Sequence, residues 1–204
     1  MIVLAIDTAA NLCAACVYDT QTGERGRAVL DLGKGHAEHL MAVIEDALKA
    51  AGITYADLGA IAVSVGPGSF TGVRVGVSTA RGLALALRIP AAGVSTLEAL
   101  AAEARGDTPK AVLARVEAGR GQAYVAAYAA DGTPTFGPLA VTVEEADAMA
   151  AETLAAGTTA DIAVYARLAA AKLAAGNVEK PKPLYLRDAD AKPQGSFALA
   201  RKPD

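Results

Sequence analysis

The chain has 204 residues, which suit one large domain or two small lobes, and 53% of them are hydrophobic. Its formal net charge is −3, whereas a protein that grips RNA by itself usually has a basic surface, so a stand-alone RNA-binding role is disfavoured. No apolar run approaches the roughly 20 residues that cross a bilayer, and the short first run lacks a basic leader. We therefore expect a cytoplasmic protein without membrane contact.

The first half of the sequence alternates between strand-like and helix-like patterns. In chain order, these patterns predict strands at 2–6, 14–18 and 27–32, a helix at 36–51, a strand at 60–65, a helix at 71–87 and a strand at 92–94. Ser95 and Glu98 have the spacing of a capping box, so another helix is expected to begin there. A meander followed by alternating strands and helices predicts an α/β fold, in which helices pack on a mixed sheet.

The second half is less regular. Turn-forming residues gather at 105–109 and predict a boundary between a first lobe, 1–106, and a second, smaller lobe, 107–204. Within the second lobe, the pattern predicts strands at 111–116, 123–129 and 136–143 and helices at 143–155 and 164–175. Four prolines from residue 180 onward predict an extended, docked tail.

The two cysteines, Cys13 and Cys16, form a C-x-x-C pair, which could indicate redox chemistry or half of a zinc site. They lie in a predicted strand, where side chains three positions apart point to opposite faces. A second cysteine pair is absent. We therefore expect two buried, reduced, structural cysteines.

The strongest local motif is a glycine-rich loop between the strand at 60–65 and the helix at 71–87. Its residues are Gly66, Pro67, Gly68, Ser69, Phe70, Thr71, Gly72, Val73 and Arg74. A phosphate could sit on the following helix N-terminus. However, a Walker A loop needs a lysine and a hydroxyl residue after its last glycine, and a dinucleotide site needs an acidic residue after the next strand. Mononucleotide binding is therefore the disfavoured alternative.

Small residues follow one face of the helix after this loop. Gly72, Gly76 and Ala80 lie four apart, which lets another element approach unusually closely. That element is either the chain's own first helix or a partner protein. A different face carries arginines, which more often form a solvated surface than a nucleic-acid contact.

Two further positions have the residue types of functional sites. His36 and His39 have a spacing that could hold a metal, but no third ligand is evident, so an exposed or interface role is favoured. Asp7 ends the first strand and Thr8 follows, which is a common site position in such sheets, and a turn role is the alternative. No Ser-His-Asp set or paired-carboxylate site can be assembled, so we assign no catalytic residue.

The stretch AVSVGPGSFTGVRVGVSTARGLALAL at 62–87, followed by Pro90 and by 93–97, resembles the TsaB (YeaZ) family. Residues 2–8, the helix beginning at His36, Tyr124 and 183–187 are also similar to the family's landmarks. The resemblance implies an actin-like, two-lobed fold, related to sugar kinases and Hsp70, with a degenerate second lobe.

In that superfamily, an Asp-x-Gly-Thr loop holds phosphate. The matching stretch here is Asp7-Thr8-Ala9-Ala10, which has no glycine, so the resemblance implies a degenerate nucleotide loop at Asp7 and Thr8. No cofactor is then expected on this chain alone, while ATP and a metal are expected on partner subunits. The alternatives are an ATP-binding kinase or ATPase of this fold and a metal-dependent glycoprotease.

The resemblance further implies that the chain is a non-catalytic partner that activates TsaD in the transfer of threonylcarbamoyl to the tRNA adenosine next to the anticodon. TsaD would form a heterodimer with this chain, and the ATPase TsaE would bind the pair. The chain would contact tRNA only within the complex. Alone, it would form a homodimer. The implied interface comprises His36, His39, Leu40, Val43, Ala47, Gly72, Val73, Gly76, Ala80 and Leu83. The sequence departs from the family at 117–120, where Glu-Ala-Gly-Arg replaces Asp-Ala-Arg.

Overall fold

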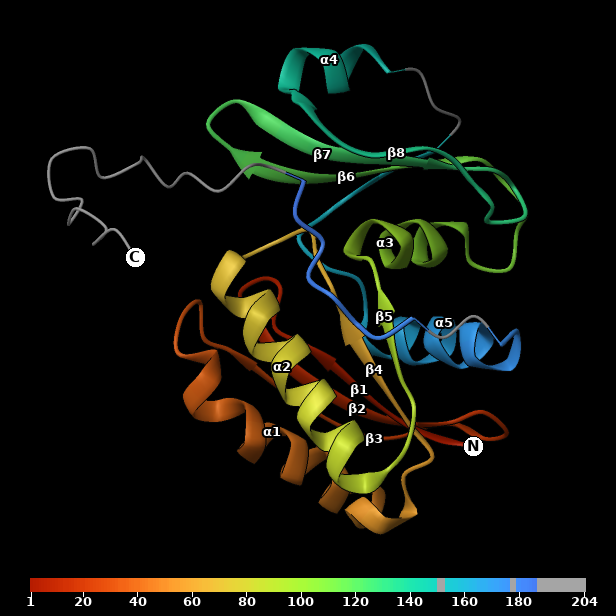
Figure 1. Cartoon of the computed structure of the whole chain (residues 1–204). Coiled ribbons are helices and arrows are strands. Elements are labelled where there is room, and N and C mark those ends of the chain that lie inside the picture. The colour runs from red at the N-terminus through yellow and green to blue at the C-terminus, as the bar shows by residue number, and fades with distance from the viewer. Residues whose placement is uncertain (150–152, 177–178, 187–204) are drawn as a thin grey trace, which may run out of the picture.

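A computed structural model describes residues 1–149, 153–176 and 179–186 (Figure 1). Its first sheet has the strand order β3-β2-β1-β4-β5. The strands are β1 (Ile2–Asp7), β2 (Leu12–Asp19), β3 (Gly23–Asp31), β4 (Ala60–Ser64) and β5 (Ala91–Val94). The meander pairs are antiparallel, whereas β4 runs parallel to both β1 and β5. Helices cover both faces of β1 and β4, which explains why their sequences are almost continuously apolar.

Two helices cover each face of this sheet. On one face, α1 (His36–Ala51) and α2 (Phe70–Leu87) bury their apolar sides against Leu4, Ile6 and Val63. On the other face, α3 (Thr96–Arg105) and α5 (Ile162–Ala174) pack against the alternate residues of the same strands (Figure 1). Within the described residues, no helix is long and apolar enough to span a membrane.

The second sheet has the order β8-β7-β6-β9. Its elements are β6 (Val112–Gly119), β7 (Gln122–Tyr128), β8 (Pro134–Thr142) and β9 (Thr153–Ala156), and α4 (Val143–Ala148) lies on its outer face. A short 3₁₀ turn, Tyr55–Asp57, precedes β4 in the first half. Because α3 contributes Leu97 and Leu100 to a core that also contains β6 and β7, this helix joins the two sheets.

The prediction of a helix at 143–155 is wrong for its second half. The helix ends at Ala148, and Thr153–Ala156 forms β9, parallel to β6. Alanine favours helix locally, but Ala155 is buried beside Ala114 of β6, and this tertiary contact decides the conformation. The N-terminus of α3 also differs, because Ser95 Oγ accepts from Leu97 N and Glu98 pairs with Lys172.

The first sheet draws on the end of the chain as well as its beginning. The division at 106 and 107 separates the strands of the two sheets, but α5 follows the second sheet in sequence and packs on the first. Lys172 fastens it there, since its Nζ lies 3.1 Å from Gly93 O and 2.7 Å from Glu98 Oε2. Residues 179–186 then run past β4, where Leu184 N donates to Val65 O at 2.8 Å. The rest of the predicted tail lies outside the described residues.

The two cysteines lie on opposite faces of β2, as the strand pattern predicts. Cys13 belongs to the core beneath α1 and α2, and Cys16 to the core beneath α3 and α5. Burial raises the pKa of the Cys13 thiol to about 11 and that of the Cys16 thiol to about 12. Both are free, buried thiols that stay protonated at neutral pH.

The packing of α5 on the first sheet can be tested by overfilling it. Ala169 is fully buried against the sheet, whereas Ala171 in the same helix is exposed. We expect Ala169→Leu to lower the free energy of unfolding by about 1–3 kcal/mol and Ala171→Leu to leave it nearly unchanged, measured by urea denaturation. Equal stability of the two variants would contradict this placement of α5.

Candidate functional site

The glycine-rich loop is seated on the turn that follows β1. Ser69 caps α2, because its Oγ accepts from Gly72 N at 3.2 Å. Its own N–H donates to Ala9 O at 2.6 Å, and the Thr8 hydroxyl donates to Gly72 O at 2.7 Å. The N-terminus of α2, where a phosphate would bind in a nucleotide site, therefore lies against the backbone of the turn after β1.

This contact is the reason for the glycines. A Cβ on Gly68 would lie 2.2 Å from Ala9 O, and one on Gly72 would lie 2.0 Å from Thr8 O. A Cβ on Gly76 would lie 2.6 Å from Thr8 Oγ1. The small-residue face of α2 thus receives the chain's own β1 end, which corrects the expectation that it meets the first helix or a partner protein.

Asp7 lies at the centre of a buried hydrogen-bonded cluster. Its side chain is 2% exposed, Oδ1 accepts from Ala9 N at 2.9 Å, and Oδ2 accepts from the Thr159 hydroxyl at 2.5 Å. The Thr159 hydroxyl also lies 2.8 Å from Tyr165 Oη. Burial raises the pKa of the Asp7 carboxyl above its usual value, although the hydrogen bonds from Thr159 and Ala9 lower it.

Two more hydroxyls complete this buried region. Ser64 Oγ, at the end of β4, lies 3.3 Å from Thr96 Oγ1, in the first turn of α3. Sequence reasoning missed Thr159 and Tyr165, because no local pattern signals a contact with a residue about 150 positions away. Both carboxylate oxygens of Asp7 have partners, and the described part of the chain contains no group of three or more His, Cys, Asp or Glu placed to hold a metal ion.

Most residues of the implied partner interface lie inside this chain. His36 is buried, and His39 is exposed although it is only three residues away. Leu83 is half-buried. The following interface candidates are buried in the chain's own core: Leu40, Val43, Ala47, Gly72, Val73, Gly76 and Ala80. The resemblance implied that these residues contact TsaD, but a charged substitution at Gly76 or Ala80 would disrupt the chain's own core.

The surface that α1 and α2 offer consists of other side chains. Met41 on α1 is 44% exposed, and Leu85 on α2 is 82% exposed. The remaining exposed positions of α1 are Ala37, Glu38, His39, Ala42, Glu45, Asp46, Lys49 and Ala50. Those of α2 are Phe70, Thr71, Arg74, Ser78, Arg81, Gly82 and Ala86. The helices thus present alanines and single large apolar residues among charges of both signs.

An exposed stack stands at the start of α2. The Arg74 guanidinium lies 3.7 Å above the centre of the Phe70 ring, and its Nε donates to Tyr185 Oη at 2.6 Å. The two rings are 5.5 Å apart. Tyr185 comes from the docked segment 179–186, so this stack joins the loop motif to the end of the described chain.

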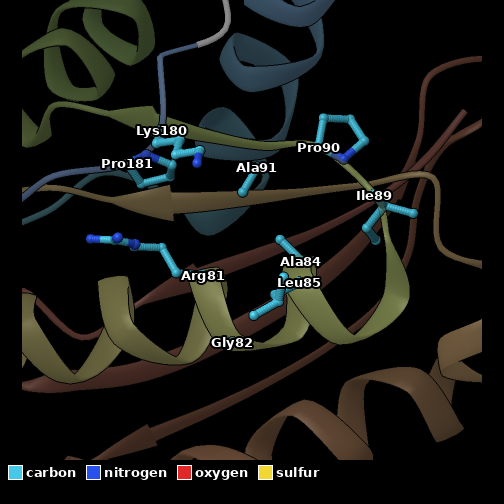
Figure 2. Close-up of a pocket in the computed structure, with 9 residues that line it drawn as sticks. All are labelled: Arg81, Gly82, Ala84, Leu85, Ile89, Pro90, Ala91, Lys180 and Pro181. Carbon is cyan, nitrogen blue, oxygen red and sulfur yellow. The ribbon is translucent and has the colours of Figure 1, made fainter.

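A groove of about 540 Å³ lies farther along α2, between this helix and the docked segment (Figure 2). Leu85, Ile89 and Pro90 form its apolar part. Arg81 and Lys180 line it as well, and Figure 2 shows both toward the end that Pro181 borders.

Comparison with known families gives a match over most of the chain. Residues 31–178 match the family described as "TsaD: tRNA N6-adenosine threonylcarbamoyltransferase". TsaB of Escherichia coli (strain K12), named a tRNA threonylcarbamoyladenosine biosynthesis protein, is 37% identical over 132 residues, which cover 64% of this chain and 56% of that protein. This chain thus matches little more than half the length of that relative.

Two other proteins match over nearly the full chain. An uncharacterized protein of Mycobacterium tuberculosis (strain ATCC 25618 / H37Rv) is 37% identical over 204 residues, 94% of each chain. A crystal structure from Pseudomonas aeruginosa, described as similar to peptidase YEAZ, superposes with a TM-score of 0.79 at 26% identity and covers 91% of this chain and 99% of that one. The mixed α/β fold expected from the sequence is confirmed.

Buried Asp7 should make stability depend on pH with a defined sign. Because its folded-state pKa is raised, its contribution is fully present below the unfolded value of about 3.9 and is lost as pH rises through the folded value. Asp7→Asn cannot ionise and can still accept from Ala9 N. We expect this variant to be more stable than wild type at pH 8, by about 1.4 kcal/mol for each unit of raised pKa, with the advantage shrinking toward pH 4. Stability is measured by thermal melts of both proteins from pH 4 to pH 8. A stability difference between Asp7→Asn and wild type that does not change with pH would contradict this prediction.

The seating of α2 can be tested with two alanine substitutions in one helix. Gly72→Ala would place a Cβ against Thr8 O, whereas a Cβ at Gly82 meets open space. We expect Gly72→Ala to destabilise the protein by at least about 1–3 kcal/mol and Gly82→Ala to stabilise it by about 0.5–1 kcal/mol, measured by chemical denaturation. A harmless Gly72→Ala would show that the close approach is not required.

Proposed function

This chain belongs to the TsaB (YeaZ) family, and we propose on that premise that it is the non-catalytic partner and activator of TsaD. The proposed complex transfers threonylcarbamoyl to the tRNA adenosine next to the anticodon. TsaD supplies the ATP and metal sites, TsaE binds the pair, and the reaction takes place in the cytoplasm.

The observation that carries this proposal is the direct contact between the α2 N-terminus and the turn after β1. In a nucleotide-binding relative of this fold, loops of this type would surround phosphate, but here Thr8 and Ala9 contact Gly68 and Gly72 directly. Asp7 would face that phosphate, but both of its carboxylate oxygens accept hydrogen bonds, one from Ala9 N and one from the Thr159 hydroxyl. This arrangement supports a scaffolding role, with the chemistry on another subunit.

The outward faces of α1 and α2 are the proposed binding surface for TsaD. The outward face of α1 combines Met41 with the small residues Ala42 and Ala50, which let a partner element approach closely. His39 and Leu83 remain accessible members of the implied interface. Its buried members pack in the core between the two helices and the first sheet. Without TsaD, the same surface would pair two copies of this chain.

Calorimetric titration separates this function from its main rival. The purified chain is titrated with TsaD from the same organism and, in a second experiment, with ATP and Mg²⁺. The proposal requires saturable heat with TsaD and none with ATP. Heat with ATP and none with TsaD would instead support a kinase or ATPase of this fold.

The binding surface itself is tested by placing a charge on α1. Met41→Glu should weaken TsaD binding at least tenfold, because a carboxylate would be desolvated in an apolar contact. Leu154→Glu is the matched control, since Leu154 is 55% exposed but lies on β9 in the second sheet. Both variants should melt like wild type. Equal TsaD affinities of the two variants would place the interface elsewhere.

A further inference from the structure

Positive charge is concentrated along one flank of α2. Arg74 and Arg81 lie seven residues apart in α2, about 10 Å along the helix, and Arg88 follows as the C-cap in a left-handed conformation. All three are exposed, and the sequence contains no aspartate or glutamate between Leu58 and Leu97. This basic strip belongs to a chain whose net charge is −3, so the charges of the protein are segregated.

The docked segment extends the strip. Lys180 and Lys182 are exposed, and Glu179 is the only carboxylate of residues 179–186. Lys180 and Arg81 line the same groove, which joins the segment to α2 (Figure 2). The basic flank therefore comprises Arg74, Arg81, Arg88, Lys180 and Lys182.

These cations are not neutralised by the described part of the chain. None of the ion pairs among described residues involves a member of the basic flank. Arg74 has partners, but they are the rings and hydroxyl of Phe70 and Tyr185, which hold the guanidinium in place without cancelling its charge. The flank thus offers fixed positive charge beside two rings that are about half exposed.

The basic flank is on α2, which also belongs to the surface proposed for TsaD, but it does not include α1. Arg81 and Leu85 line the groove with Ala91 of β5 and Pro181, so this side of α2 faces the docked segment. Figure 1 shows α1 on the other side of α2. A ligand on the flank would therefore leave the outward face of α1 free.

The geometry points to the basic flank as a contact surface for the RNA backbone, an inference that rests on the proposed function because the complex must hold a tRNA. Three arginines along roughly 20 Å of α2 and its C-cap, with Lys180 and Lys182 on the docked segment beside the helix, suit a line of phosphates. Exposed Phe70 and Tyr185 can stack on an unpaired base. An acidic protein is the other candidate. It fits less well, because Leu85 is the only large aliphatic side chain exposed among these charges, whereas protein interfaces have apolar, charge-depleted centres.

Charge reversals in the assembled complex test the inference. Complexes of TsaD with wild type, Arg81→Glu or Lys180→Glu are titrated into a labelled, unmodified tRNA transcript at salt concentrations from about 50 to 200 mM. Each reversal should weaken tRNA binding by roughly tenfold at the lowest salt and reduce the slope of log K against log salt by about 1. Arg167→Glu is the matched control, because Arg167 is an exposed arginine on α5, across the first sheet. It should bind tRNA like wild type.

Two results would overturn the inference while leaving the proposed function intact. In the first, the complexes assemble and both reversals bind tRNA with wild-type affinity and slope. In the second, the reversals lose TsaD while the control keeps it, which would make the flank a protein contact. If wild type itself fails to bind TsaD in calorimetry, both the proposed function and this inference are wrong.

Discussion

The direct approach of the α2 N-terminus to the end of β1 is the contact on which the rest of the structure depends. Gly68 and Gly72 bring backbone against the carbonyls of Ala9 and Thr8, at distances that leave no room for a Cβ. The same contact positions α2 over β4, places Ser69 as its cap and aligns the outer face of the helix. A motif that looks like a phosphate loop in sequence thus serves here to join a helix to a strand.

A buried polar cluster adjoins this contact. Asp7 lies at the end of β1, Thr159 and Tyr165 surround it, and burial raises the pKa of its carboxyl. Since α5 carries Tyr165 and follows the second sheet in the chain, the cluster ties the end of the described chain to the first strand. The polar core therefore contributes to the joining of the two halves.

Sequence periodicity predicted elements better than it predicted their partners. The helix at 36–51 was found at those residues, and the first two strands of the meander overlap the predicted ranges 2–6 and 14–18. An apolar helical stripe ended by Gly52 and short apolar runs bounded by polar residues are local signals. The spacing of Gly72, Gly76 and Ala80 correctly indicated a close approach, but spacing carries no information about which element approaches. The strand β9 was missed for a related reason, since its alanines are ordered by β6 rather than by their neighbours in sequence. Contacts such as Asp7 with Thr159 depend on the completed fold and have no local signal.

We propose that this chain activates a catalytic partner and performs no chemistry itself. The most direct test of this proposal is a reconstitution with TsaD, threonylcarbamoyl adenylate and unmodified tRNA, in which the modified adenosine is quantified after nuclease digestion. We expect little product from either protein alone and a large increase when both are present. Product formed by this chain alone, or no increase over TsaD alone, would contradict it.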